Sequence, residues 1–369
     1  MIDNQIITPP TTINPHKRES GVELLRIIAA CFVIILHYCN SSIGQAFDYV
    51  TSGSISEYTL LCFQSMAVCA VDIFVLISGY FLCKSKKRTW DKPLSLLIQL
   101  ILFSVLYYLI TTVASGQQIN VGTLAQKFLP KNYFVILYVA LYMVSPYINC
   151  AIEKLTTHQF KKLLIVLVAL FCLWPIFVDI LRFYFGVNDF GLSTVGAWGS
   201  QHGYTIVSFV LIYILGAYLR LHFNIESITR QKYIFYAVFC VLVIFVWAVV
   251  DIHMLNKPAP DCALAYNNPF VIVEAAVLFI LFKKMTFRNK IVNNLAGAAF
   301  TCYLIHGYFI HHIKIEYFVQ QSPILLILHL VGAPLLLYFV SWVVCKVFNW
   351  VFKPLFSRLK RPIITNIID

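Results

Sequence analysis

The chain has 369 residues, of which 60% are hydrophobic and only 12% are charged. Soluble domains carry about 25% charged residues, so this composition excludes a soluble globule, a disordered chain and a secreted disulfide scaffold. Lys and Arg outnumber Asp and Glu by 28 to 16. Nucleic-acid binding or the positive-inside bias of a membrane protein would explain that balance, and the location of the charges decides between them.

Ten apolar runs are each close to the length of about 20 residues that a helix needs to cross a bilayer. Residues 1–21 are polar and contain three prolines, so they predict a solvated tail rather than a signal peptide. Residues 353–369 form a basic tail, which leaves 22–352 as the membrane domain. Pro175 and Pro334 predict kinks in the fifth and tenth helices. The sequence thus predicts an all-α bundle of ten transmembrane helices at 22–41, 60–82, 93–115, 133–149, 162–184, 204–221, 233–253, 268–285, 291–313 and 323–352.

The basic residues set the expected orientation of this bundle. With the N-terminus in the cytoplasm, 22 of the 28 Lys and Arg lie in cytoplasmic segments or their flanks, and only 4 lie in outer loops. This asymmetry predicts that both termini are cytoplasmic, and it explains the basic balance without nucleic acid. We expect a multi-pass protein of the plasma (inner) membrane. Its outer loops are short, so any chemistry must come from helix-borne side chains and short loops.

The cysteines do not form a recognisable site. The sequence has 11 of them, scattered without a CxxC pair and mostly inside apolar runs. Cysteine in such positions behaves as a small hydrophobic residue. We therefore predict neither a disulfide framework nor a zinc site, and we expect no metal.

Ionisable residues inside a membrane are costly and are candidates for function. The first predicted helix holds three of them, Glu23, Arg26 and His37. Arg26 and His37 are eleven residues apart. Because that spacing is three helical turns plus about 20°, both side chains project from one face, about 16 Å apart along the axis. Glu23 lies near the same face. An interfacial Glu–Arg pair with a histidine bonded inside the bundle is the structural alternative.

Other ionisable residues also lie within predicted helices, and three of them are candidates for the site. Asp72 is a candidate to pair with Arg26 or to orient His37, and Glu274 is a candidate for an acceptor contact or a proton relay. His306 fits a buried core position as well as a site. A secondary transporter or glycan exporter that uses Asp72, Glu274 and His306 as polar relays is therefore the alternative function. Such carriers often have paired broken helices in two halves, which this sequence does not indicate.

Three motifs carry a resemblance to a known family. Arg26 is followed by ten residues and then His37, VDIFVLISGYFL (71–82) contains Ser-Gly-Tyr, and AFTCYLIHGYF (299–309) contains Tyr-Leu-x-His. Together with the ten spans, these motifs resemble the acyltransferase-3 family of integral-membrane acyltransferases over about 22–350. Glu23 stands where that family usually has Asp. KSKKR (84–88) stands where many relatives carry an Arg-x-x-Arg pair.

The resemblance implies an O-acyltransferase, and it implies acetyl-CoA or another acyl-CoA as the donor. The implied acceptor is a hydroxyl of a cell-surface polysaccharide or of a lipid-linked glycan precursor. His37 is the implied general base, and a histidine is suited to that role because its ordinary pKa lies near neutral pH. A thioester already has a good leaving group, so no metal is required. Whether His37 acts only as a base or carries the acyl group transiently stays open.

The remaining candidates have less specific roles. Arg26 would bind the anionic donor or orient the pocket through Glu23. His306 matches a position of the family motif, whereas Asp72 and Glu274 are supporting candidates because of their places within predicted helices. Lys86, Lys87 and Arg88 are candidates to bind the phosphates of CoA, although a basic loop of this kind also serves as an orientation signal and contacts anionic lipid. Since His37 lies past the middle of its helix, we expect the acceptor to approach from the outer side.

Overall fold

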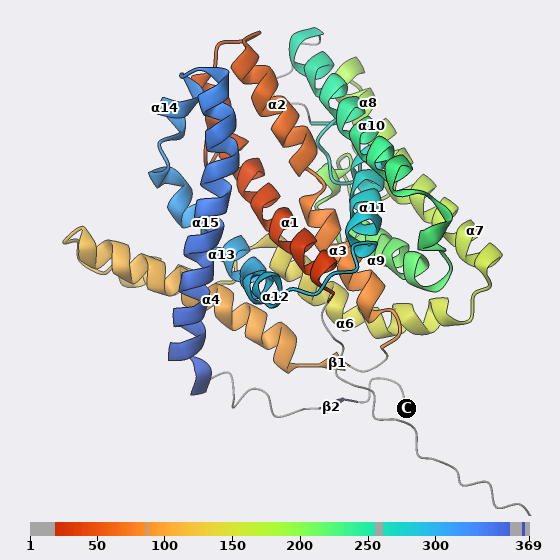
Figure 1. Cartoon of the computed structure of the whole chain (residues 1–369), viewed down its shortest axis with the longest axis horizontal. Coiled ribbons are helices and arrows are strands. Elements are labelled where there is room, and N and C mark those ends of the chain that lie inside the picture. Colours follow the sequence, from red (N-terminus) through yellow and green to blue (C-terminus); the bar gives the residue numbers. More distant parts are fainter. Residues whose placement is uncertain (1–18, 86–87, 255–260, 355–363, 366–369) are drawn as a thin grey trace, which may run out of the picture.

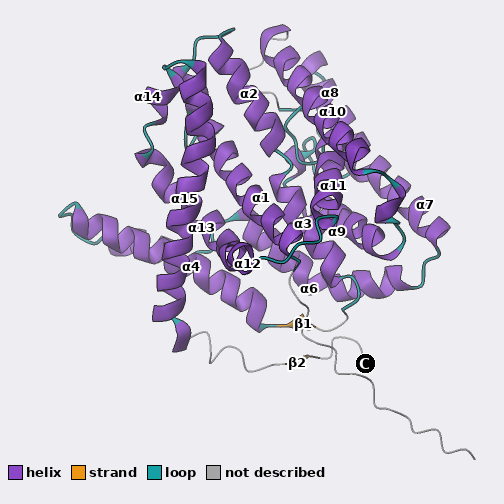
Figure 2. Cartoon of the chain, viewed as in Figure 1, coloured by secondary structure: helices purple, strands orange, loops and turns teal. Residues whose placement is uncertain are grey.

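The computed structural model of the chain is a bundle of α-helices, most of which run side by side (Figure 1). It describes residues 19–85, 88–254, 261–354 and 364–365. Most of this described part is helical (Figure 2), which confirms the prediction of an all-α protein. Two short strands within it, β1 (Arg88–Thr89) and β2 (Ile364–Thr365), pair antiparallel, with Arg88 opposite Thr365.

Seven described helices, some of them interrupted, are long and apolar enough to cross a membrane. Their positions follow the predicted runs closely, because a run of apolar side chains is the strongest signal that a sequence contains. The chain is thus a multi-pass membrane protein. The seven are α1 (Ser20–Cys39), α2 with α3 (Ile55–Ala67 and Ala70–Leu82), α4 (Asp91–Ala114), α6 (Tyr133–Glu153), α7 with α8 (Thr157–Val168 and Trp174–Phe185), α10 (Arg230–Val249) and α15 (Pro323–Val351).

Shorter helices occupy the other three predicted runs. They are α9 (Ile206–Leu221), α11 (Pro269–Lys283), and α12 (Lys290–Leu295) with α13 (Ala299–Phe309). The count of ten membrane-spanning helices and the cytoplasmic position of both termini therefore stay predictions. Two further short helices, α5 (Val121–Lys127) and α14 (Ile315–Val319), lie in connecting segments. Residues 1–18 of the predicted N-terminal tail lie outside the described residues.

Several predicted helices are less regular than the sequence indicates. The second span turns at Val68 and Cys69, where α2 ends and α3 begins. One π turn at Ala169–Leu173 leads into α8, whose early Pro175 has no amide hydrogen to donate, and another at Val250–Met254 ends α10. By contrast, α15 continues through Pro334.

Polar side chains define where several helices begin. Asn132, Thr205 and Asn268 accept hydrogen bonds from backbone amides in the first turns of α6, α9 and α11. The first amides of a helix have no partner within the helix, and the hydrocarbon of a bilayer offers none. These caps therefore stabilise helix ends that would otherwise leave buried donors unpaired.

Among the described helices, α3 and α9 share the most extensive contact, and two glycines explain it. A Cβ added to Gly79 would meet the Tyr213 carbonyl oxygen at 2.1 Å, and one added to Gly216 would meet the Leu76 carbonyl oxygen at 2.3 Å. Small residues allow the backbones of membrane helices to approach this closely. Around this pair, α1 packs against α2, α3, α11, α13 and α15, so it lies at the centre of the bundle (Figure 1).

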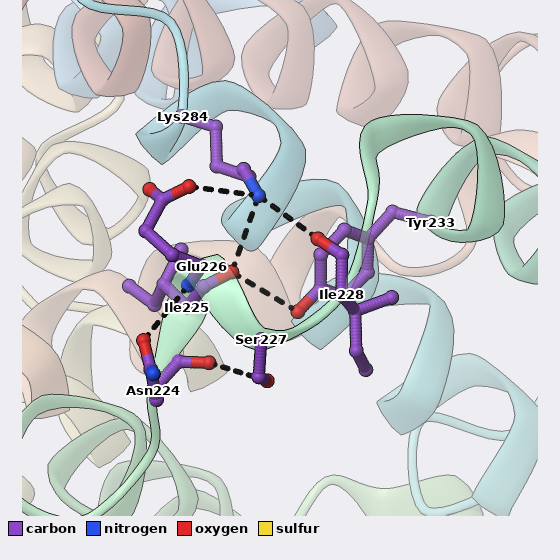
Figure 3. A network of polar contacts seen from close by, with 7 residues as sticks. All are labelled: Asn224, Ile225, Glu226, Ser227, Ile228, Tyr233 and Lys284. Carbon is purple, nitrogen blue, oxygen red and sulfur yellow. Dashed lines mark hydrogen bonds and ion pairs between the residues drawn. The ribbon is translucent and has the colours of Figure 1, made fainter.

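One end of the bundle is held together by ion pairs and caps. Nζ of Lys283 lies 2.5 Å from Glu19, which places the end of α11 beside the start of α1. Lys284 bonds to Glu226 at 3.1 Å and to the carbonyl oxygens of Ile225 and Ile228, as Figure 3 shows. The connection between α9 and α10 is thereby fixed to the end of α11. These lysines, expected as orientation signals, also join three helices.

Candidate active site

Two histidines from different helices meet inside the bundle. His37 lies in the last turn of α1 and His306 lies in the last turn of α13. Nδ1 of His37 is in hydrogen-bonding contact with Nε2 of His306, and the two ring planes differ by only 13°. His306 is 3% exposed, whereas His37 is half-buried. The fold thus joins two residues that the sequence presents 269 positions apart.

The hydrogen bonds of this histidine pair assign its protons. Nδ1 of His306 lies 2.9 Å from the carbonyl oxygen of Cys302, which can only accept, so that nitrogen carries a hydrogen. In a neutral His306, Nε2 is then an acceptor, and Nδ1 of His37 donates to it. A neutral His37 is left with an unprotonated Nε2. The pair therefore holds one imidazole in the tautomer that a general base requires.

Glu23 and Arg26 form an ion pair between residues about one helical turn apart on α1. Nη1 of Arg26 lies 3.0 Å from Oε1 of Glu23, and the carboxylate is buried while the guanidinium is partly exposed. The sequence spacing of three residues predicted this proximity. Both side chains line a cavity, so the pair contributes charge to a hollow rather than to the lipid surface.

The cavity has a volume of about 310 Å³ and lies between α1, α3, α4, α6 and α13. Its lining combines the charged Glu23, Arg26 and Lys92 with the polar Ser78 and Tyr138 and with several aromatic rings. Such a mixture, mostly apolar with a few polar groups, is typical of small-molecule sites. The charged side chains come from the start of α1 and α4, at the end of the bundle where Glu19 binds Lys283.

Aromatic side chains lie between this cavity and the histidine pair. Phe134 and Tyr303 both line the cavity, and their ring centroids are 4.9 Å apart. The Tyr303 ring is 6.2 Å from the ring of His306, one turn further along α13. Its hydroxyl donates to Oδ1 of Asn132 at 3.0 Å. Tyr303 is thus in contact with the cavity on one side and with the histidine pair on the other.

The Ser-Gly-Tyr motif of α3 has three structural roles. Ser78 lines the cavity and bonds to the Tyr138 hydroxyl at 3.2 Å. Gly79 permits the close approach of α9. Tyr80 accepts a hydrogen bond from Arg220 at 3.1 Å, with the guanidinium 5.0 Å from its ring centroid. The motif therefore shapes one wall of the cavity and fixes the helix that carries it.

Asp72 and Glu274 are both about 1% exposed, in α3 and α11. Neither lines the cavity. In the part of the chain that the structure describes, the oxygens of Asp72 have no hydrogen-bond partner, whereas Glu274 interacts with the thiol of Cys69. Arg26 pairs with Glu23 and not with Asp72, so the arrangement of the described residues does not include the expected Asp72–Arg26 pair. The supporting roles of Asp72 and Glu274 stay predictions.

The structure describes only part of the basic loop KSKKR (84–88). Lys86 and Lys87 lie outside the described residues. Arg88 is 2% exposed, and its guanidinium donates to Ser145, to Ser85 and to the carbonyl oxygen of Leu82 at the end of α3. This geometry gives Arg88 a structural role at a helix terminus. A role in binding donor phosphate stays a prediction for all three residues.

Sequence reasoning did not single out several residues of the site. In the sequence, Lys92 is one of the 22 basic residues that set the expected orientation. In the structure it lines the cavity, and its Nζ lies 5.1 Å from the Tyr142 ring centroid. The sequence alone does not indicate Asn132 or Tyr303 as site residues. The signal for Tyr303 was its spacing of three residues from His306, which places both on one face of α13.

A half-buried imidazole with an unprotonated Nε2 thus lies near a charged cavity in a helical membrane bundle. The comparison with known families is more specific. Residues 19–346, nearly the whole chain, match the acyltransferase-3 family, which is described as an acyltransferase domain. The chain therefore belongs to this family. No curated protein and no solved structure matches the chain.

Proposed function

We propose that this protein transfers an acetyl group from acetyl-CoA to a hydroxyl of a cell-surface polysaccharide or of its lipid-linked precursor. Membership of the acyltransferase-3 family supports the reaction class. The observation that carries the mechanism is the histidine pair, in which His306 accepts from Nδ1 of His37 and leaves Nε2 of His37 free. We place the reaction in the plasma (inner) membrane.

The proposed reaction has two steps at one nitrogen. In the first, Nε2 of His37 removes the proton of the acceptor hydroxyl while the hydroxyl oxygen attacks the thioester carbonyl carbon. In the second, the carbon–sulfur bond breaks, and the departing sulfur of CoA takes the proton from Nε2. General-base catalysis of this kind contributes about 10²–10⁴-fold to a rate. The products are the O-acetyl ester and free CoA, and the neutral histidine is restored.

The donor fits the cavity on chemical grounds. Arg26 and Lys92 are the basic side chains among its lining residues, and both lie near its charged end, which we predict to be cytoplasmic. Phosphate groups of CoA would bind there, because a guanidinium and an ammonium both form charge-assisted hydrogen bonds to phosphate. The apolar remainder of the cavity, ending at Phe134 and Tyr303, suits the flexible arm that carries the thioester.

The test uses purified full-length protein in lipid vesicles with radiolabelled acetyl-CoA. The acceptor is surface polysaccharide prepared from cells that lack this protein. We expect label to move to the polysaccharide with the unchanged protein, and we expect His37→Ala to lower that transfer by about 10²-fold or more. His311→Ala is the matched control, because His311 is an exposed histidine just beyond α13 and not part of the pair.

Two results would contradict the proposal. If His37→Ala transfers label at an unchanged rate, with equal amounts of folded protein, His37 is not the general base. Movement of polysaccharide or lipid-linked glycan across the vesicle membrane without covalent labelling would support a carrier instead. The carrier alternative is not favoured, because the family match points to an acyltransferase.

A further inference from the structure

Three tyrosines from separate segments meet at one end of the bundle. Tyr133 is the first residue of α6, Tyr204 shortly precedes α9 and Tyr266 shortly precedes α11. The far ends of α9 and α11 carry Arg220 and Lys283, on the side that holds the charged mouth of the cavity. This tyrosine cluster (Tyr133, Tyr204 and Tyr266) therefore lies at the end that we predict to face outward.

The rings of the cluster pack edge to face and keep open surfaces. The centroids of Tyr133 and Tyr204 are 4.6 Å apart, and those of Tyr204 and Tyr266 are 5.0 Å apart at an angle of 86°. Tyr133 is 40% exposed and Tyr204 is 44% exposed, whereas Tyr266 is buried. The two exposed rings thus pack on each other, Tyr204 packs on the buried Tyr266 as well, and both exposed rings remain available for contact.

The loop that carries Tyr204 has an unusual backbone conformation. Gln201 and His202 both have left-handed backbone angles, with φ of 53° and 52°, which side chains other than glycine rarely adopt. The amide of Tyr266 donates to the carbonyl oxygen of His202 at 3.0 Å, which joins this loop to the one before α11. Strained backbone of this kind persists only where its surroundings impose it, and it concentrates at functional sites.

A short series of contacts leads from the cluster to the proposed chemistry. Asn132 directly precedes Tyr133, and its side chain accepts the hydrogen bond of the Tyr303 hydroxyl. Tyr303 lines the donor cavity and lies one turn from His306 on α13. The cluster is therefore next to the site where donor and base would meet, on the side opposite the mouth of the cavity.

We propose that the tyrosine cluster binds a neutral sugar ring of the acceptor on its approach to the histidine pair. This inference rests on the proposed function and adds the place and the chemical class of the bound group. A sugar ring presents a C–H face that packs on an aromatic ring, and it presents hydroxyls that bond to phenolic oxygens. The C–H face requires an open ring, which Tyr133 and Tyr204 supply.

The charges near the cluster also favour a neutral ring. Burial raises the pKa of Tyr266, so its phenol stays protonated and can donate a hydrogen bond at neutral pH. Two carboxylates close to the Tyr204 loop already have partners. Asp179 accepts from the amide of Ser200 at 2.9 Å, and Asp189 lies 3.4 Å from Arg182.

The test separates the Michaelis constants for the two substrates. It uses the full-length protein in lipid vesicles, acetyl-CoA, and surface polysaccharide from cells that lack the protein. Replacing Tyr204 with Ala should raise KM for the polysaccharide by about ten-fold or more, because an aromatic contact at the centre of a binding site often dominates affinity. KM for acetyl-CoA should stay within about two-fold, since Tyr204 does not line the cavity.

Two further variants sharpen this test. Tyr204→Leu removes the flat ring but keeps apolar bulk, and it should give the same selective rise where the alanine variant does not fold. Tyr317→Ala is the matched control, because Tyr317 is 56% exposed on α14 and its ring packs only on the adjacent Phe318 among the contacts of the described residues. It should leave both KM values unchanged.

The outcomes are distinguishable from those of the proposed function. Absence of transfer by the unchanged protein contradicts the function itself. Normal transfer with an unchanged polysaccharide KM in both Tyr204 variants overturns the sugar site. Equal losses of folded protein in Tyr204→Ala and Tyr317→Ala, with KM unchanged for what remains, would also overturn it and identify both tyrosines as anchors at the membrane interface.

Discussion

Replacement of His306 tests how the histidine pair works. His306→Ala removes the acceptor for Nδ1–H of His37 and leaves that donor without its partner inside the bundle. A buried donor that loses its partner costs about 1–3 kcal/mol, which corresponds to about 5- to 150-fold in a rate constant. His37 can avoid that cost by moving its hydrogen to Nε2, but the basic nitrogen is then lost. By either route, kcat for acetyl transfer should fall by about 5- to 150-fold.

The assay measures initial rates of transfer from radiolabelled acetyl-CoA at several donor concentrations. We expect kcat to fall with little change in KM for acetyl-CoA, because His306 does not line the cavity. His306→Gln should recover much of the activity, since its amide oxygen can accept from Nδ1 of His37. His306→Leu, of similar size but without an acceptor, should not.

A double variant makes the prediction stricter. If His306 acts only through His37, then His37→Ala with His306→Ala should be no slower than His37→Ala alone. Three results would refute the reasoning: unchanged kcat in His306→Ala, equal rates in the Gln and Leu variants, or a further loss in the double variant. Each requires equal amounts of folded protein, which size-exclusion chromatography in detergent measures.

Three other changes have distinct expected outcomes. Arg26→Gln should raise KM for acetyl-CoA about ten-fold, because it removes a positive charge that would bind phosphate in the cavity. An unchanged KM for acetyl-CoA would contradict that role. Arg88→Ala should lower the free energy of unfolding by about 3 kcal/mol, measured as a lower Tm, because a buried network loses its donor. A raised donor KM at unchanged Tm would instead assign Arg88 to phosphate binding. Gly216→Ala should destabilise the protein by about 1–3 kcal/mol, since the new Cβ would lie 2.3 Å from the Leu76 carbonyl oxygen. Gly332→Ala, where a Cβ meets nothing within 4 Å, should leave Tm unchanged, and equal effects at the two glycines would contradict the packing argument.

Most of the helices could be predicted from the sequence because their signal is local. Apolar runs of sufficient length mark α1, α4 and α15 almost to their ends. The turn at Val68 and Cys69 left no comparable signal, since the residues on both sides are equally apolar. The π turn at the end of α10 left no signal for the same reason, whereas Pro175 marked the fifth run as the place of an irregularity.

The candidate site was also predictable only where its residues are close in the sequence. Glu23, Arg26 and His37 share one helix, so helical geometry alone places them on one face. The contact between His37 and His306 depends on how α1 and α13 pack, which no local pattern encodes. Arg88 shows the converse, because a basic run in a loop says nothing about which of its members is buried. Tertiary packing therefore decides which polar residues form a site.

The central claim is that His37 acts as the base of an acetyl transfer to a glycan. The most direct measurement is the mass of the surface polysaccharide from cells that make either the unchanged protein or His37→Ala at equal levels. We predict that each repeat which carries an acetyl substituent in the first case lacks it in the second. Identical acetyl content in the two polysaccharides would contradict the claim.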